Sequence, residues 1–423
     1  MILRPTASGA RRRGLSLVLI VVSLVALFGV LALSLEGGML MTERRNAQAT
    51  ADAAAMAAAA DFYWHHFENF GTDPSNTARN AALYAANKNG YTNDTTTNTV
   101  DVRIPPTTGD YTNRPSYTEV VVEWKHVRGF SSIFGTGTIP VRARAVSVGK
   151  PSAGDFGILV LDPTAKSAFN ANGGGNITIT NTPIVVNSSA IDGSIAGGGS
   201  HISAPSFELV GNYTTSGGGS FDGTIHTGVT PMEDPFAWLP APSTTNMVQQ
   251  QKKKMQLTSG STILYPGLYT GGISASSSAN VVMMPGIYYM QSGGFAFTGA
   301  GSLTANGVFI YVEPGNGNAD GVNVAASGSI TMSPMTTGIY SGILFDQDRT
   351  SSVTANVSGG GNMNLTGTFY FAGAQLNVTG GGSFGNFGSQ YVSKDLNVQG
   401  NGNMTVDWDP NKVGKVRLIT IVE

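Results

Sequence analysis

The sequence predicts a mainly β protein with an N-terminal transmembrane α-helix, a small α+β unit and a C-terminal parallel β-helix, or solenoid. Three features of the 423-residue chain carry this prediction: an uncharged apolar run after a basic N-terminus, an alanine-dense stretch, and glycine-led repeats over the last two thirds. We expect a basic cytoplasmic segment at 1–13, a transmembrane helix at 14–36, an α+β unit at 37–150 and the β-helix at 151–423.

The composition excludes several classes of function. Hydrophobic residues make up 41% of the chain, which is enough for a substantial core. Only 12% of residues are charged and the net charge is −2, so we expect no nucleic-acid partner. The chain has no cysteine, which removes disulfides, thiolate catalysis and cysteine metal sites.

The apolar run predicts a membrane anchor in the lipid bilayer. It extends from Leu15 to Leu35, with Leu24 and Phe28 among its bulky residues. As a helix it covers roughly 30 Å, the thickness of a bilayer core. Arginines precede the run, whereas charges of both signs follow it, so the positive-inside rule places the N-terminus in the cytoplasm and the rest in the periplasm or outside the cell. A cleaved secretory signal is the rival interpretation, but its apolar core would be shorter.

The next stretch, 39–61, is alanine-rich and free of proline and glycine, which predicts a helix. Gly37 and Gly38 are expected to loosen the chain before it. Alanines at spacings of three and four form one narrow face on which another helix can pack closely. The alternative is that this face docks on the protein's own strands. The four alanines are Ala47, Ala51, Ala54 and Ala58.

The remainder of the α+β unit is expected to hold a helix at 77–89 and strands at 99–104, 118–126 and 141–148. Gly90 suits a left-handed residue that closes the helix. The segment 119–124 is rich in β-branched residues, as expected of a central strand. Pro140 is expected to set the start of the last strand, because proline cannot donate to a ladder.

Repeats dominate the rest of the chain. Glycines followed by Asn and an apolar-polar-apolar triplet recur almost identically at 173–179, 359–365 and 400–406, and further glycine marks lie 20 to 24 residues apart. This spacing is typical of a solenoid coil. About a dozen coils would make a rod on the order of 55 Å long.

A second repeated motif supports the predicted solenoid, because Pro-Gly-x-Tyr at 266–269 recurs at 285–288. A proline-rich excursion at 229–262 interrupts the repeats. We expect Phe236, Trp238 and Leu239 within it to plug the end or side of the rod, in preference to forming a partner-binding loop.

Few residues suggest chemistry. Asp346 and Asp348 lie two apart on an expected strand beside Arg349, an arrangement suited to calcium binding or to acid-base work on sugars, although a solvated turn or local ion pair explains it as well.

Two histidines in consecutive coils, His201 and His226, are a weaker metal candidate with Asp222. The sequence has no phosphate loop, nucleophile elbow or zinc-peptidase motif. We therefore expect no catalytic residue, cofactor or metal.

The N-terminal region resembles the TadG-like proteins of the tight-adherence (Flp) pilus assembly system. Glu36 and Gly38 end the apolar span, Arg44-Arg45 and Gln48 follow, and 51–59 reads Ala-Asp-Ala-Ala-Ala-Met-Ala-Ala-Ala, close to that family's stretch. The glycine-rich remainder is similar to repetitive C-terminal regions of some such bacterial proteins. One departure concerns processing, since the fifth position after Gly14 is Leu19 rather than the Glu of pilin precursors.

The resemblance implies an envelope component of pilus assembly or surface adhesion, with pilus-assembly membrane proteins or surface glycans as partners. It also implies that the N-terminal α-helix and the α+β unit at 37–150 are pilin-like. We expect a non-catalytic, membrane-anchored protein whose β-helix is a spacer or binding surface. An envelope-tethered polysaccharide-active β-helix enzyme is the alternative, and a minor pseudopilin is a third possibility.

Overall fold

The chain forms two compact units, and one of them is inserted into the other. The computed structural model describes residues 12–315, 321–359, 362–380 and 383–423. Unit 1 comprises the residues up to Pro151 together with Arg417–Glu423, and unit 2 is Ser152–Val416. The last residues of the chain, which the expected boundary of 151–423 assigned to the β-helix, therefore complete unit 1. The mainly β class is confirmed, with 46% of the chain in strands.

A single long helix, α1 (Arg12–Trp64), begins the described part of unit 1. It contains both the apolar run and the alanine-rich stretch, and it continues through Gly37 and Gly38 without a break, contrary to the expected loosening. Each glycine costs a helix only about 1 kcal/mol relative to alanine, which the strong helix formers on both sides offset.

The rest of unit 1 is a four-stranded sheet with two short helices, α2 (His66–Asn69) and α3 (Thr77–Lys88). Its strand order is β1-β2-β3-β28, with antiparallel pairing of β1 with β2 and of β2 with β3. A 3-10 turn, η1 (Phe130–Phe134), lies between β2 and β3. The strands are β1 (Asn98–Arg103), β2 (Tyr117–Val127), β3 (Thr138–Ala153) and β28 (Lys415–Ile421).

These elements confirm the expected helix and three strands to within a few residues. Pro140 is the exception, since it lies inside β3 opposite Lys125 instead of starting the strand. Alternate residues of β2, among them Val120 and Val122, face the core, as the two-residue period of a strand requires.

Unit 2 is a parallel β-solenoid of about ten turns, which confirms the predicted architecture. Its first strands along the chain are β4 (Ile158–Val160), β5 (Phe169–Asn172), β6 (Asn176–Ile179), β7 (Ile184–Val186), β8 (Ser194–Gly197), β9 (His201–Leu209), β10 (Tyr213–Thr215) and β11 (Ser220–Thr227). The later strands are β12 (Gln249–Gln251), β13 (Met255–Leu257), β14 (Ser261–Leu264), β15 (Gly267–Ala275), β16 (Asn280–Met283), β17 (Gly286–Gly299), β18 (Ser302–Glu313), β19 (Val322–Ala326), β20 (Ser329–Pro334), β21 (Ile343–Gln347), β22 (Ala355–Gly359), β23 (Met363–Leu365), β24 (Thr368–Gly380), β25 (Ser383–Asn386), β26 (Gln390–Gly400) and β27 (Asn403–Val406).

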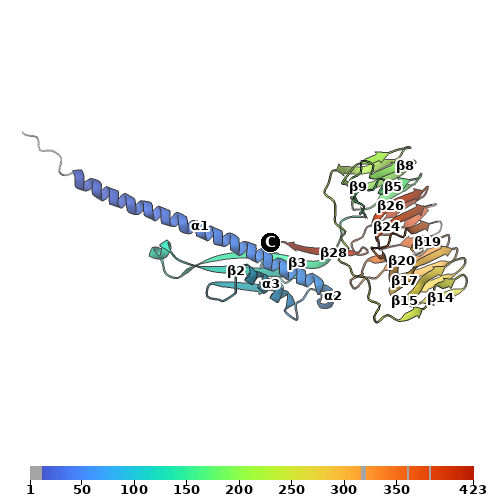
Figure 1. The fold of residues 1–423 in the computed structure, drawn as a ribbon, viewed down its shortest axis with the longest axis horizontal. Helices are drawn as coiled ribbons and strands as arrows, with labels where there is room; N and C mark the ends of the chain where they lie inside the picture. The colour runs from blue at the N-terminus through green and yellow to red at the C-terminus, as the bar shows by residue number, and fades with distance from the viewer. Residues whose placement is uncertain (1–11, 316–320, 360–361, 381–382) are drawn as a thin grey trace, which may run out of the picture. The chain divides into compact units, whose positions relative to one another are not determined.

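The coils do not stack in the order of the sequence. The last coil, β26 and β27, pairs with the first coil, β4 to β6. From there the early strands continue to β11 at one end of the rod, whereas the late strands begin with β12 at the other end. Figure 1 shows this permutation as green strands stacked on red ones, followed by orange and then yellow. The chain therefore enters and leaves the solenoid between its two ends. We call the ladder between β26–β27 and β4–β6 the closing seam.

Residues 228–248, which we call the strap, connect the two ends of the rod. Ten strand spacings amount to about 48 Å, which an extended chain of this length can span. The strap is shorter than the excursion expected at 229–262, because residues from Gln249 onward already form strands. Phe236 and Leu239 are buried in a side cluster with Tyr340 and Tyr370, which confirms the expectation that they plug the rod's side.

Candidate functional site

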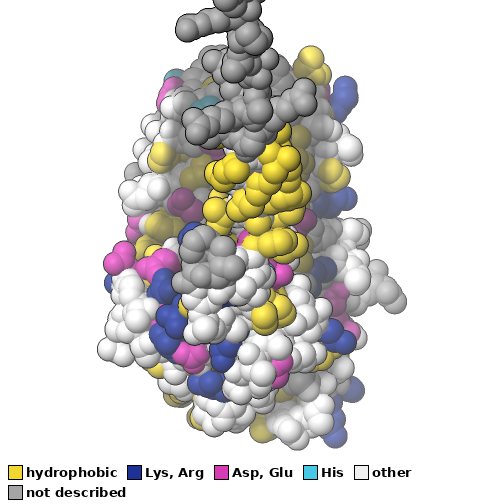
Figure 2. Space-filling view, turned by 90° about the vertical axis from the view of Figure 1, so that its left-hand side faces the viewer, with side chains coloured by type: hydrophobic (Ala, Val, Ile, Leu, Met, Phe, Trp, Pro, Cys, Tyr) yellow, Lys and Arg dark blue, Asp and Glu magenta, His cyan; other side chains and the backbone are white. Residues whose placement is uncertain are grey.

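The first candidate site is the exposed apolar part of α1. This is the one helix in the described part of the chain that is long and apolar enough to cross a membrane, and its most apolar stretch is not buried. Leu24, Phe28 and Leu35 of the predicted anchor are exposed, while the side chain of Leu15 lies outside the described residues. Figure 2 looks at this helix from its N-terminal end and shows hydrophobic side chains along it.

Glu36 closes the apolar stretch, and its carboxylate is buried in hydrogen bonds to the turn between β2 and β3. The backbone N–H of Ser131 donates to Oε2 at 2.6 Å, and the Ser131 hydroxyl donates to Oε1 at 2.7 Å. The N–H of Gly129 donates to Oε1 at 3.2 Å, and His126 Nε2 lies 3.7 Å from the same oxygen. One carboxylate at the end of the span therefore fixes the tip of a hairpin almost a hundred residues later in the chain.

The alanine stripe lies in the core of unit 1. Its four residues pack with the alanines of α3 and with β2, and each is fully buried. The face that sequence reasoning offered for assembly with another helix is thus covered by the chain's own elements. The residues of the stripe are Ala47, Ala51, Ala54 and Ala58.

The acidic pair lies beside the strap in unit 2. Asp346, Asp348 and Arg349 line a hollow of about 300 Å³ with Tyr311 and Leu239. Burial raises the pKa of Asp346 well above its ordinary value. Burial acts in the same direction on Asp348, but hydrogen bonds from Thr350 and Tyr311 outweigh it and lower the pKa of that carboxyl. The pKa values of two carboxyls in one hollow are thus shifted in opposite directions.

Arg349 connects this hollow to the strap. Its guanidinium donates to the carbonyls of Ala237 and Leu239 at 2.9 Å each, and also to the carbonyl of Phe236. Its Nε donates to the Tyr370 hydroxyl at 2.6 Å, and that hydroxyl donates to Asp234 at 2.6 Å. The planar guanidinium suits such a set of converging acceptors. In this arrangement Arg349 holds the strap against the coils.

The histidines do not form a joint site. His201 pairs with Ser220 across the ladder and hydrogen-bonds its hydroxyl at 2.8 Å, whereas His226 contacts Glu208 at 2.9 Å. Asp222 lies 3.9 Å from His201. Within the described ranges, no cluster of three or more His, Asp or Glu side chains is arranged to hold a metal ion.

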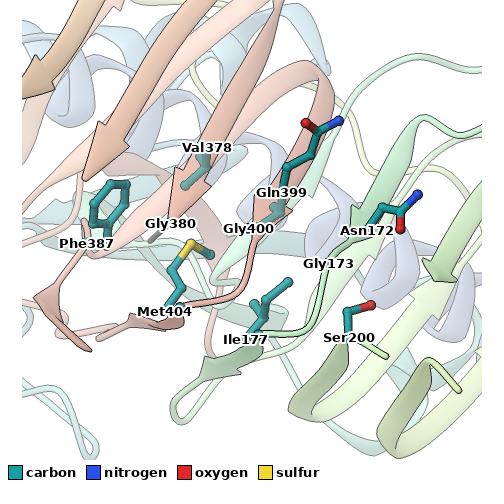
Figure 3. Close-up of a pocket in the computed structure, with 13 residues that line it drawn as sticks. Asn172, Gly173, Ile177, Ser200, Val378, Gly380, Phe387, Gln399, Gly400 and Met404 are labelled. Carbon is teal, nitrogen blue, oxygen red and sulfur yellow. The ribbon is translucent and has the colours of Figure 1, made fainter. Parts of the chain in front are cut away.

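The closing seam surrounds a small void of about 20 Å³. Figure 3 shows Ile177 and Met404, which are ladder partners, together with Val378 and Phe387 around it. The backbone is equally close-packed here, because a Cβ added to Gly173 would lie 2.2 Å from the carbonyl oxygen of Gly400. The seam is a packed part of the core and offers no room for a substrate.

Sequence reasoning missed two of these features, the Glu36 contact and the closing seam. An acidic residue at the border of an apolar span was the available signal for the first, since such a charge needs partners when it is buried. The signal for the second was the close likeness of 173–179 to 400–406, which the structure stacks directly. In an ordinary repeat array each coil stacks on the next one in the sequence, so two similar coils at opposite ends are not expected to be in contact.

The fold and these sites define a β-solenoid protein with a candidate membrane-spanning N-terminal helix. Residues 14–61, which form most of α1, match the family model described as putative Flp pilus-assembly TadE/G-like. The match confirms the predicted resemblance of this segment to TadG-like proteins. No curated protein and no solved structure matches the chain.

Proposed function

We propose that the chain is a single-pass envelope protein of Flp (tight-adherence) pilus assembly or surface adhesion, with a cytoplasmic N-terminus and both units beyond the membrane. One observation carries this proposal: the TadE/G-like match at 14–61 coincides with the helix whose apolar side chains from Leu17 to Leu35 are exposed. Exposed side chains of this kind along several helical turns require a nonpolar surrounding, which a bilayer provides.

The solenoid is proposed to act without catalysis, as a spacer or as a binding surface for surface glycans or pilus-assembly membrane proteins. Hydrogen-bonded asparagines stack along it, from Asn356 through Asn377 and Asn397 to Asn170. Such ladders make a regular polar surface on a stiff rod, because each coil is held by its neighbours. A regular rod of this kind supports both a spacing role and repeated weak contacts with a polymer.

The anchor is tested by deleting residues 1–34, which keeps Glu36 and the alanine stripe. We expect the full chain to float with membranes in a density gradient and the shortened chain to remain soluble. Protease added to intact spheroplasts should digest the body of the full chain and spare its N-terminal segment. Flotation of the shortened chain would contradict the anchor, and protection of the body would contradict the orientation.

The pilus role is tested by removing unit 2 in cells. Because β3 and β28 are neighbours in one sheet, a short linker can replace 152–416 without opening unit 1. We expect cells with this variant to keep the anchored protein but to lose surface adhesion, and cells lacking the whole chain to lose pilus assembly or adhesion. Normal pili and adhesion in both strains would overturn the proposal.

A tethered polysaccharide-active enzyme remains a second candidate, because Asp346 and Asp348 carry opposite pKa shifts in one hollow, as acid and base pairs do. A screen of neutral and anionic glycans with the purified chain tests it. Turnover that disappears in both Asp346→Ala and Asp348→Ala would support an enzyme, and the absence of turnover would leave the binding role.

A further inference from the structure

The tip of the β2–β3 hairpin lies beside the membrane-spanning part of α1. Gly129, Phe130 and Ser132 from the tip and Phe28, Leu31 and Leu35 from α1 line a groove of about 650 Å³. The tip therefore lies alongside α1 on the N-terminal side of Glu36, toward the apolar run. Phe28 precedes Glu36 by eight residues, or about 12 Å along a helix.

Exposed apolar side chains lie both on the span and on this tip. Phe130 and Val127 are 56% and 76% exposed, and Phe28 is 60% exposed across the groove. Met39 and Met41, just beyond Glu36 on α1, are exposed as well. Apolar side chains exposed together on two elements mark an interaction surface more often than a water-facing one.

The Glu36 contact explains how a loop can lie beside the membrane-spanning part of α1. Backbone N–H groups cannot be left without an acceptor in a hydrocarbon environment. Here the carboxylate accepts from the N–H groups of Gly129 and Ser131, and the N–H of Ser132 donates to the carbonyl of Gly129. Three backbone N–H groups of the tip thus have acceptors within the protein, while the side chain of Phe130 is exposed.

We propose that the β2–β3 tip inserts into the outer leaflet of the bilayer beside α1, with lipid acyl chains filling the groove. The wall of this groove on α1 is uneven, because the large side chains of Phe28, Leu31 and Leu35 alternate with the small residues Gly29 and Ala32. Flexible acyl chains can fill such an irregular apolar groove. Glu36 acts as a positioning residue that sets the depth of the tip. This inference rests on the membrane anchor proposed above.

The absence of cysteine makes a direct test possible. The full chain carrying Phe130→Cys is labelled with an environment-sensitive NBD dye and reconstituted into phosphatidylcholine–phosphatidylglycerol vesicles with and without doxyl-labelled lipid. Asn87→Cys, on the exposed surface of α3, is the matched control. We expect blue-shifted emission and doxyl quenching at position 130, with neither at position 87. Val127→Cys serves as a second tip site if Phe130→Cys does not fold.

Two further readouts separate the possible failures. Vesicle flotation is measured on the same samples: a chain that does not float refutes the anchor, whereas a chain that floats with an unquenched, water-exposed label refutes the tip insertion alone. Blue-shifted emission without doxyl quenching would place protein, not lipid, in the groove and overturn the proposal. Glu36→Gln should reduce quenching at 130 while flotation is retained, and unchanged quenching would remove Glu36 from the positioning role.

Discussion

Asn170 donates a hydrogen bond of 3.1 Å to Asn397, although the two residues lie 227 positions apart in the chain. Their strands, β5 and β26, pair in parallel, and the same offset of 227 recurs where Gly174 donates to Asn401. The solenoid is therefore completed only when its last coil finds its first. This contact separates the structure from an ordinary array, in which each coil stacks on the one before it.

The closing seam should be intolerant of a side chain at Gly173. This residue has φ of +153° and its Cβ position lies 2.2 Å from Gly400 O, so Gly173→Val combines backbone strain with overlap. We expect a loss of about 2–5 kcal/mol in the free energy of unfolding of unit 2. Urea unfolding followed by circular dichroism measures it. Gly174→Ala is the control, because its Cβ meets only the Asn401 side chain at 3.2 Å; equal losses in both variants would contradict the seam.

Removing Arg349 should release the strap. Arg349→Ala leaves the carbonyls of Ala237 and Leu239 without their donor, at a cost of about 1–3 kcal/mol. We expect faster chymotrypsin cleavage within 228–248, and a smaller increase for Arg349→Lys, which keeps the charge without the planar fork. Lys253→Ala, at an exposed position, is the control. Wild-type cleavage rates in Arg349→Ala would show that other contacts hold the strap.

Two adjacent alanines of α1 provide a test of its packing in unit 1. Ala54 is fully buried, whereas Ala53 is exposed. Ala54→Leu should cost about 1–3 kcal/mol by overpacking, and Ala53→Leu should change stability by less than about 0.5 kcal/mol. Hydrogen exchange of the amides in β2 and α3 reports the difference. If the stripe served another helix instead, both variants would leave this exchange unchanged.

Unit 1 should lose stability in acid through Glu119. Burial opposes its ionisation, but hydrogen bonds from Arg144, Thr108 and Thr107 outweigh that and bring its pKa from 4.5 to about 2. A pKa lowered in the folded state stabilises the fold above pH 4.5, and this contribution is lost as the pH falls toward 2.

Thermal unfolding between these pH values, with exchange of β2 amides to locate the change, measures the effect of Glu119. Glu119→Gln should be less stable at pH 7, and its stability should fall less steeply as the pH decreases from 4.5 to 2. Asp101→Asn, whose side chain is half exposed, should keep the slope of the parent protein. An unchanged slope in Glu119→Gln would assign the acid sensitivity to other carboxyls.

The sequence allowed the elements of this fold to be predicted, but not their order in space. The strand at 403–406 shows its two-residue period locally, because alternate side chains face the core. Which coil lies next to it depends on the whole chain. The repeated Pro-Gly-x-Tyr phrase illustrates the limit: the Tyr269 and Tyr288 rings stack at 5.9 Å, yet the ladder pairs Gly267 with Tyr288 rather than with Gly286.

The candidate sites also divide into local features that the sequence predicts and long-range contacts that it does not. The apolar run that contains Phe28 and Leu35 can be recognised from local composition alone, and its length predicts a membrane anchor with exposed side chains. The role of Arg349 was unpredictable, because its acceptors lie in the strap more than a hundred residues earlier. The Glu36 contact depends on a hairpin whose length and direction sequence periodicity leaves undetermined. Glu36 at the border of the apolar run signals that a partner is needed, but nothing in the sequence says which residues supply it.

Insertion of the solenoid between β3 and β28 has a mechanical consequence. A tensile load on unit 2 passes to unit 1 through two covalent connections into neighbouring strands of one sheet, so the load is shared. A single backbone break anywhere in 152–416 would also leave both fragments tethered to unit 1. If the rod lies at a cell surface as proposed, where shear and proteases act together, two connections resist detachment better than a single linker would.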